Sequence, residues 1–328
     1  MHHQHNPNQT FGTAPQRQFG ETFIALLVLL VLWIPPASAH SEEAEPFPWS
    51  CSEGQPPEEA LAASEELLAT QWRTYTQLRR SLGNLKRYTK LRPLYIRAGV
   101  CDVGRFLTDG IVTTRFLGRP IRVHTRAVTP LARVEEVLLA QTTSRRQRKR
   151  RLPVRFARVG TFHARSIRTP YGPIEKLSRH GLGLAMDIDP QRNPFLSVEE
   201  LEVLTLVSGV TIDRRSTVPA GERWDTFQEA AVAFRKRLRP WLRRTAQTAR
   251  RLRTQLRTHP SSEQEAELEQ LEAHYALVRG TRLRTVRSRG FLSLPRAFVV
   301  AMEEAGFVWA TDFPSGADLM HFELRQRP

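Results

Sequence analysis

The stretch 176–189 constrains this chain more than any other, because it places an imidazole and a carboxylate seven residues apart around a glycine-rich bend. His180 and Asp187 are separated by Gly181 and Gly183. The second half of the stretch alternates between apolar residues and small or acidic ones, which predicts a strand with one face in a core. The glycines allow a turn that brings His180 to the point at which Asp187 is directed. Such a pair suits a divalent metal such as zinc.

Two ligands do not complete a zinc site, and the best candidate for the third is His321, near the end of the chain. Asp318 lies three residues earlier and would act as a base. Asp189 could support a ligand histidine or could be a solvated carboxylate. We assign His163 no role in the site and expect an ordinary surface or core histidine there.

The N-terminal region predicts export. An uninterrupted apolar run at 23–34 is followed by two prolines and by Ala37-Ser38-Ala39, the pattern of a signal peptide cleaved after Ala39. The run is shorter than the about 20 residues that span a bilayer. We expect a periplasmic or secreted protein with no membrane span after cleavage; the alternatives are an uncleaved anchor and a buried helix.

Export affects how the two cysteines are interpreted. Cys51 and Cys101 could pair in an oxidising compartment, or they could remain two separate buried thiols. Neither has the setting of a nucleophile.

The chain is strongly basic, with a formal net charge of +16 over 328 residues. This charge favours polyanionic partners such as an anionic cell-wall polymer, and export makes nucleic acid the least expected of them. Arginine is concentrated in the block 145–151 and in the longer stretch 235–257. An ordinary solvated loop and a solvated helix face are the alternatives for these two blocks.

Periodicity and turn residues predict an α+β fold, in which a small antiparallel sheet carries the zinc site and is packed with helices. We expect a capping box from Ser197 to Glu200 and a kink at Pro240, and Ser262 as a helix cap. Helices are expected at 58–87, 131–141, 197–210, 224–257, 263–278 and 295–305. Strands are expected at 94–100, 110–116, 121–128 and 154–165, and in the last segment from residue 307.

These elements suggest a division into four parts. Residues 1–39 are the signal peptide, and 40–92 form an acidic linker and an amphipathic helix. Residues 93–212 and 289–328 form the core that would carry the zinc site, and 213–288 form an arginine-rich helical hairpin inserted between its halves.

Several motifs resemble those of a known group. Ser178-x-His180-x-x-Gly183-x-Ala185-x-Asp187 matches the SxHxxGxAxD pattern of the zinc D-Ala-D-Ala carboxypeptidase superfamily. Asp318-x-x-His321 is similar to the second half of that site, and the segment 160–168 looks most like the extensin-like branch. The resemblance covers about 154–190 and 293–324. Leu319 stands where lysostaphin-like relatives have a histidine, and Met320 and Phe313 where many have tryptophan.

The resemblance implies a role for each matching residue. His180, Asp187 and His321 would hold Zn²⁺, and Asp318 would be the general base. Arg165 would steady a substrate carboxylate or carbonyl during catalysis. The residues Arg165, Arg168 and Ser178 would bind substrate or orient the His180 turn.

The function this implies is an exported zinc-dependent peptidase that hydrolyses amide bonds in peptidoglycan peptides. The resemblance does not choose between D,D- and L,D-specificity, or between carboxypeptidase and endopeptidase. The first alternative is a non-catalytic cell-wall-binding module that retains the fold. The second is an arginine-rich nucleic-acid binder, which conflicts with the signal peptide and explains none of the site residues.

Overall fold

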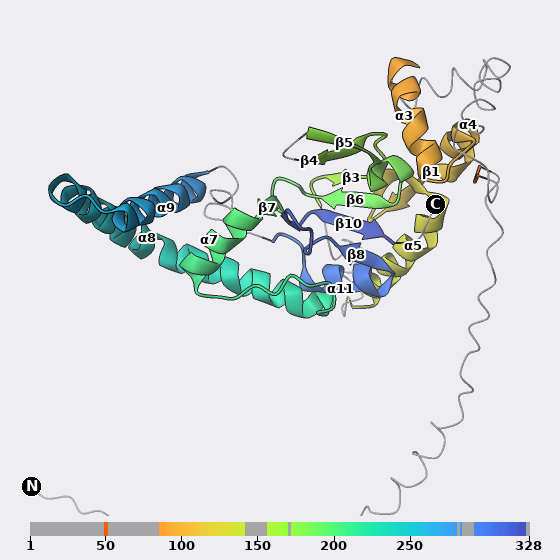
Figure 1. Cartoon of the computed structure of the whole chain (residues 1–328). Coiled ribbons are helices and arrows are strands. Elements are labelled where there is room, and N and C mark those ends of the chain that lie inside the picture. Colours follow the sequence, from red (N-terminus) through yellow and green to blue (C-terminus); the bar gives the residue numbers. More distant parts are fainter. Residues whose placement is uncertain are drawn as a thin grey trace, which may run out of the picture. The chain divides into compact units, whose positions relative to one another are not determined.

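The computed structural model describes residues 49–51, 85–141, 156–169, 172–280, 283 and 292–325 (Figure 1). These residues all belong to one compact unit that spans residues 47–328. The predicted signal peptide, most of the predicted helix 58–87 and the basic block 145–151 lie outside the described residues.

A four-stranded antiparallel sheet forms the centre of the fold, with the strand order β3-β6-β10-β8. It comprises β3 (Val159–Gly160), β6 (Ala185–Ile188), β10 (His321–Leu324) and β8 (Phe307–Trp309). The apolar residues of these strands are buried, among them Met186, Ile188, Trp309 and Phe322. The strand that carries Asp187 (β6) and the strand that carries His321 (β10) therefore pair directly within one core, as Figure 1 shows.

Three two-stranded antiparallel ladders accompany this sheet. They pair β1 (Ile111–Phe116) with β2 (Arg119–His124), β4 (Ser166–Thr169) with β5 (Gly172–Leu177), and β7 (Phe195–Ser197) with β9 (Gly316–Asp318). The combination of small antiparallel sheets with helices confirms the coarse α+β prediction.

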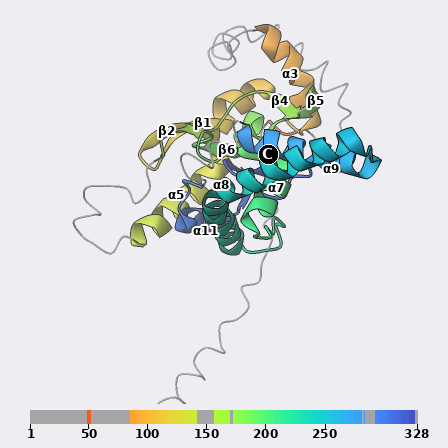
Figure 2. The same ribbon diagram turned by 90° about the vertical axis from the view of Figure 1, so that its left-hand side faces the viewer.

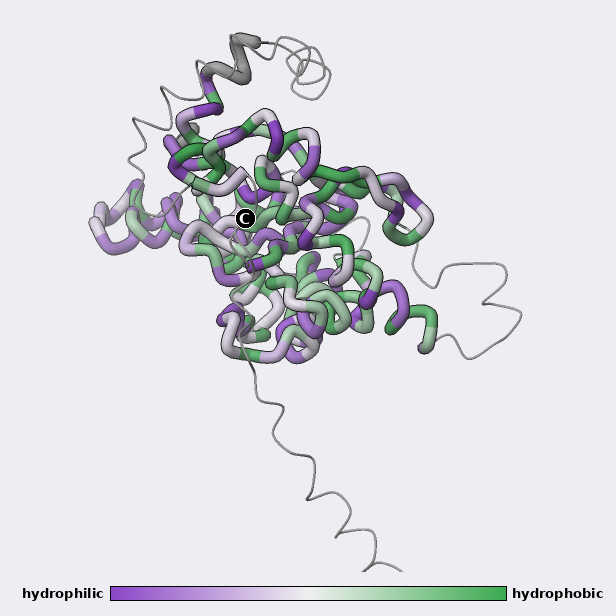
Figure 3. The backbone as a smooth tube through the Cα atoms, turned by 90° about the vertical axis from the view of Figure 1, so that its right-hand side faces the viewer, coloured by the Kyte–Doolittle hydropathy of each residue, from purple (hydrophilic) through white to green (hydrophobic). Residues whose placement is uncertain are grey.

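The helices are α3 (Leu85–Arg97), α4 (Val103–Arg105), α5 (Thr125–Ala140), α7 (Val198–Ser208), α8 (Ala220–Thr258), α9 (Ser262–Arg279) and α11 (Arg296–Glu304), with a π-helical turn η1 (Phe106–Gly110) and a 3-10 turn η2 (Arg179–Leu182). Helix α11 contacts α5, α8 and β8, so it joins the central sheet to the long helix. Helix α8 also contacts α7 and α9, and these three lie together in Figure 2. Hydrophobic and hydrophilic residues alternate along the helices (Figure 3), as expected where one side packs on a core.

The predicted capping box is confirmed. Ser197 caps α7 and forms the predicted capping box with Glu200, because each side chain bonds the other residue's backbone N–H. Gly306 follows α11 with φ +90°, a conformation that glycine adopts without a Cβ penalty. Pro240 lies inside α8, which runs from Ala220 to Thr258, and the kink expected there stays a prediction.

The predicted strand 94–100 is wrong, since this segment continues α3 as far as Arg97. Pro93 lies inside this helix, and Leu91, Leu94 and Tyr95 are buried at the three- and four-residue steps of a helix. Packing on this stripe therefore outweighs the hydrogen bond that the proline removes.

Other boundaries also differ from the prediction, including the start of the predicted helix 131–141, which lies at Thr125. The predicted strand 121–128 ends at His124, whose Nδ1 accepts the N–H of Arg126 and begins α5. Within the described part of the predicted strand 154–165, only Val159–Gly160 is a strand. Helix α9 has Ser261, rather than Ser262, in the N-cap position.

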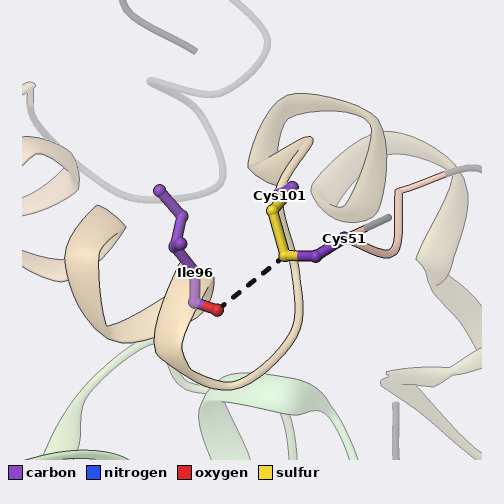
Figure 4. The surroundings of a disulfide bond; sticks show 3 residues. All are labelled: Cys51, Ile96 and Cys101. Atoms are coloured by element: carbon purple, nitrogen blue, oxygen red, sulfur yellow. Dashed lines mark hydrogen bonds between the residues drawn. A yellow bond between two sulfur atoms is a disulfide. The ribbon is translucent and has the colours of Figure 1, made fainter. Parts of the chain in front are cut away.

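Cys51 and Cys101 form a disulfide, shown in Figure 4. The Cys51 sulfur lies 3.9 Å from the carbonyl oxygen of Ile96. Around the disulfide, the backbone N–H of Cys101 donates to the carbonyl of Trp49, and the side chain of Trp49 is buried. The disulfide thus fastens the segment 49–51 to the connection between α3 and α4. Within the described ranges, no helix combines the length and the apolar character needed to cross a membrane.

Candidate metal centre

His180 lies in the 3-10 turn η2, which is capped by Ser178 at its start and by Gly183 at its end. The Ser178 hydroxyl accepts the backbone N–H of His180 at 3.3 Å, and the N–H of Ser178 donates to the carbonyl of Arg165 at 2.9 Å. Gly183 ends the turn with φ +67°, and a Cβ there would lie 2.6 Å from the backbone nitrogen of His124. No other residue fits this position without displacing the backbone, so the glycine fixes how the turn carrying His180 meets the core.

Asp187 and His321 are brought together by strand register. They are direct partners in the antiparallel pairing of β6 with β10, so their side chains leave the sheet on the same face. Gly160 of β3 lies opposite Asp187 on the other side. A Cβ on Gly160 would be 3.7 Å from that of Asp187, so the glycine adds no side chain beside the carboxylate.

The three predicted ligands converge. His180 Nε2 lies 3.1 Å from Asp187 Oδ1 and 3.2 Å from His321 Nδ1, and His321 Nδ1 lies 3.0 Å from Asp187 Oδ1. His180 and His321 are 2% and 8% exposed. The distances show that one atom from each residue is directed at a common point, and these three residues form a group that could hold a metal ion.

The tautomers of the two histidines suit ligation. His180 Nδ1 lies 2.8 Å from the carbonyl oxygen of Thr161, which can only accept, so Nδ1 carries the proton and the lone pair is on Nε2. His321 Nε2 faces Glu323 Oε2 at 3.6 Å, leaving Nδ1 toward Asp187. In metal sites, a ligating histidine commonly directs its second nitrogen at a carbonyl or carboxylate in this way.

The ionisation of Asp187 depends on the two histidines beside it, and that of His321 depends on Asp187. Burial raises the pKa of Asp187, but hydrogen bonds from His180 and His321 outweigh it and hold the pKa well below its usual range. Burial lowers the pKa of His321, yet hydrogen bonds to Asp187 and Glu323 raise it to about 9. Without a metal ion, the positive charge of protonated His321 therefore compensates the buried carboxylate of Asp187. A bound metal cation would replace that proton.

Asp318 ends β9 beside this group. Its Oδ1 is buried and has no hydrogen-bond partner among the described residues. Burial raises the pKa of Asp318 to about 6. The charges of His321 and His180 lower this pKa, and the charge of Asp187 raises it. An unpartnered buried carboxylate oxygen is costly unless something polar binds it, so this atom is the best available acceptor for a proton or a hydrogen-bonding ligand at the site.

Two short backbone hydrogen bonds fix Asp318 relative to His321. Ala310, just after β8, accepts the N–H of Asp318 at 2.7 Å and donates its own N–H to the carbonyl of His321 at 3.0 Å. The loop between β9 and β10 is further held by Trp309, whose indole N–H donates to the carbonyl of Leu319 at 3.0 Å. The predicted base and the third ligand therefore share one supporting backbone.

The other predicted site residues are placed as follows. Arg165 contributes its carbonyl to the His180 turn, and Arg168 lies in β4, paired with Pro173, with its side chain outside the described set. Substrate-directed roles for Arg165, Arg168 and Ser178 stay predictions.

Asp189 is neither solvated nor directed at a ligand histidine, because its buried carboxylate accepts the N–H of Arg158 at 2.5 Å. His163 is exposed, and its backbone N–H donates to the backbone carbonyl of His180.

Three contributors were not predicted from the sequence. Thr161 and Ala310 act through backbone atoms, which leave no trace in residue type. Glu323 was identifiable, because it lies two residues after His321 on the same face of a strand. Comparisons with protein-family models, with curated proteins and with solved structures found no match for this chain.

Proposed function

We propose that this protein is an exported zinc-dependent peptidase that hydrolyses amide bonds in peptidoglycan peptides. The observation that carries the proposal is the convergence of His180 Nε2, Asp187 Oδ1 and His321 Nδ1 next to the unpartnered Oδ1 of Asp318. Two histidines and one carboxylate are a common protein ligand set for catalytic zinc, which keeps a fourth position for water or substrate.

The spacing of the three atoms is compatible with a zinc ion. Tetrahedral zinc with bonds of about 2.0–2.1 Å has ligand atoms about 3.3 Å apart. The three observed separations are 3.0, 3.1 and 3.2 Å, so little movement is needed to reach that geometry. The set contains no thiolate, because the two cysteines form the disulfide and lie elsewhere.

The chain's own residues supply the remaining chemistry. A zinc ion held here would provide Lewis acidity and make water acidic enough to act as a nucleophile near neutral pH. Asp318 accepts a proton from the attacking water and returns it to the leaving amine, as a general base that then acts as an acid. Thr161 and Glu323 hold the two imidazoles in the tautomers that leave Nε2 of His180 and Nδ1 of His321 for ligation.

The test is digestion of purified peptidoglycan sacculi by zinc-loaded protein, with the released fragments identified by mass spectrometry. Wild-type protein should release peptide fragments, and Asp318→Asn should reduce the rate by about 10²–10⁴-fold, the contribution typical of a general acid–base residue. The Asp318→Asn variant should keep its zinc, and His163→Ala should behave as wild type.

Two results would contradict the proposal. Zinc-loaded wild-type protein that binds sacculi without releasing fragments would indicate the non-catalytic wall-binding module instead. Release that Asp318→Asn leaves unchanged would remove the base from the mechanism.

A further inference from the structure

The second half of α8 carries a continuous cationic face. Residues 230–258 contain ten lysine and arginine residues and no aspartate or glutamate. All ten side chains are exposed. They are Arg235, Lys236, Arg237, Arg239, Arg243, Arg244, Arg250, Arg251, Arg253 and Arg257.

These cations lie on the side of α8 that faces away from the rest of the protein. At 100° per residue, they occupy about half of the helix circumference. The other half is the buried apolar stripe, formed by Phe227, Ala230, Ala231, Phe234, Leu238, Trp241, Ala249 and Leu252. Because α7, α9 and α11 contact α8, packing accounts for the apolar side and leaves the cationic side to solvent.

Few of these charges are neutralised within the described part of the chain. Arg253 pairs with Glu272 of α9, and Arg237 donates to the carbonyl of Ser208. These two residues lie at the two edges of the cationic half. The eight cations between them have no ion pair or hydrogen bond to any described residue. Like charges packed this densely repel one another, so the face is suited to an external polyanion.

The face has the form of an extended row rather than a compact pocket. Arg235, Arg239, Arg243, Arg250 and Arg257 recur at one- or two-turn intervals along about 33 Å of helix. A linear polymer with a carboxylate on every sugar, or every second sugar, presents negative charges at a comparable spacing. A single small anion would use only a fraction of this row.

A membrane surface and a nucleic acid fit this face less well. The only exposed large apolar residue of α8 among those described is Val232, before the row begins, whereas helices that lie in a bilayer interface bury an apolar face. Within the row 235–257 the one aromatic residue, Trp241, is buried and cannot stack with bases. The disulfide between Cys51 and Cys101 is typical of compartments outside the cytosol, where acidic glycans are abundant and nucleic acids are scarce.

We propose that the exposed arginine face of α8 binds a linear acidic polysaccharide, at a site separate from the metal centre. Binding is electrostatic, so it weakens steeply as salt rises. The proposal does not depend on peptidase activity, because none of the eight cations belongs to the ligand set.

The test measures binding of the purified full chain to polygalacturonate, a linear carboxylate polymer, with neutral dextran as the reference. The α8 variant combines Arg239→Gln, Arg243→Gln, Arg250→Gln and Arg257→Gln. The control combines Arg115→Gln, Arg119→Gln, Arg133→Gln and Arg192→Gln, at exposed positions outside α8. Each variant removes four positive charges, and glutamine keeps nearly the helix propensity of arginine.

The α8 variant should bind polygalacturonate about tenfold more weakly than wild type, as expected for the loss of four exposed ion pairs. The control variant should bind nearly as wild type, and dextran should not bind. Both variants should keep the zinc content of wild type, which separates this result from failure of the peptidase proposal.

Three outcomes would overturn the proposal. Equal weakening in both variants would indicate an effect of net charge alone. Unchanged binding by the α8 variant would exclude this face. Tighter, α8-dependent binding to duplex DNA or to phosphatidylglycerol vesicles than to polygalacturonate would assign the face to another class of partner.

Discussion

His321 lies directly opposite Asp187 in the pairing of β10 with β6, with 3.0 Å between Nδ1 of the histidine and Oδ1 of the aspartate. This register joins two residues 134 positions apart in sequence. A one-residue slip of either strand would move one side chain to the other face of the sheet. The metal group therefore depends on the same strand pairing that forms the core.

The buried carboxylate of Asp318 should destabilise the metal-free protein at neutral pH. Burial raises its pKa from 3.8 to about 6, so the folded state binds a proton more tightly than the unfolded state. Stability from this group is then complete below about pH 4 and is lost as pH rises through about 6. With a chelator present, Asp318→Asn should be more stable than wild type at pH 8, by on the order of 3 kcal/mol.

Urea denaturation at pH 4 and pH 8 measures this difference. The stability gain of Asp318→Asn should disappear at pH 4, where both forms are neutral at this position. Glu304→Gln makes the same chemical change at an exposed site and should show little gain at either pH. A gain that is the same at both pH values would contradict the role assigned to ionisation.

Glu323 should strengthen metal binding although it is not a ligand. It faces Nε2 of His321, and its pKa is lowered, first by hydrogen bonding with His321, so it stays ionised there. Glu323→Ala should weaken zinc affinity by about 10–100-fold, as loss of such supporting partners typically does. Competition with a zinc-binding dye gives the affinity; an unchanged value, equal to that of Glu304→Ala, would show that His321 needs no such support.

Gly183 and Gly99 allow backbone strain to be separated from steric clash. Both have positive φ, at +67° and +88°, but only at Gly183 would a Cβ meet backbone, 2.6 Å from the nitrogen of His124. Gly99→Ala should cost about 1–2 kcal/mol, for the left-handed conformation alone. Gly183→Ala should cost clearly more and weaken zinc binding through the His180 turn. Equal losses of unfolding free energy in the two variants would contradict this account.

Arg223 links the start of α8 to the backbone that supports the metal site. Its fully buried guanidinium pairs with Glu303 and donates to the carbonyl of Trp309 at 3.1 Å and to the hydroxyl of Thr311 at 2.6 Å. Ala310 lies between Trp309 and Thr311 in the chain, and its backbone forms hydrogen bonds with the backbone of both Asp318 and His321. Arg223 therefore determines where the loop carrying the predicted base and ligand is held.

Removing this arginine should be strongly destabilising, because Glu303 loses its cationic partner and its carboxylate keeps only the N–H of Ala220 among the described residues. Arg223→Met should lower the free energy of unfolding by about 3–5 kcal/mol, and adding Glu303→Gln should restore part of the loss. Arg253→Met breaks a pair whose side chains are 55% and 49% exposed, and should cost at most about 1 kcal/mol. Similar losses at the buried and exposed pairs, measured by urea denaturation, would be contrary to this expectation.

The grouping of His180, Asp187 and His321, which could hold a metal ion, was predictable because its side chains stand in a short, regular sequence pattern. Alternation after Gly183 predicts the strand that presents Asp187, and the glycine itself marks the turn behind His180. The capping box at Ser197 and Glu200 was likewise readable, since it depends on residues three apart. Local signals of this kind need no knowledge of the tertiary structure.

What could not be predicted depends on distant packing or on backbone atoms. The helical state of 94–97 is decided by burial of Leu94 and Tyr95 against the core, although Pro93 lies within the helix. The carbonyl of Thr161 fixes the tautomer of His180 but has no residue-specific signal. The disulfide was left open from sequence, because pairing depends on how closely the fold brings Cys51 to Cys101, whose Cα atoms are 4.9 Å apart.

The most direct measurement of the central claim is the metal content of exhaustively dialysed protein, determined by elemental analysis. Wild-type protein and His163→Ala should each retain about one zinc per chain, while Asp187→Ala and His321→Ala should retain almost none. Metal-free wild-type protein that cannot be loaded with zinc, or ligand variants that hold as much zinc as wild type, would contradict the assignment of His180, Asp187 and His321 as one site.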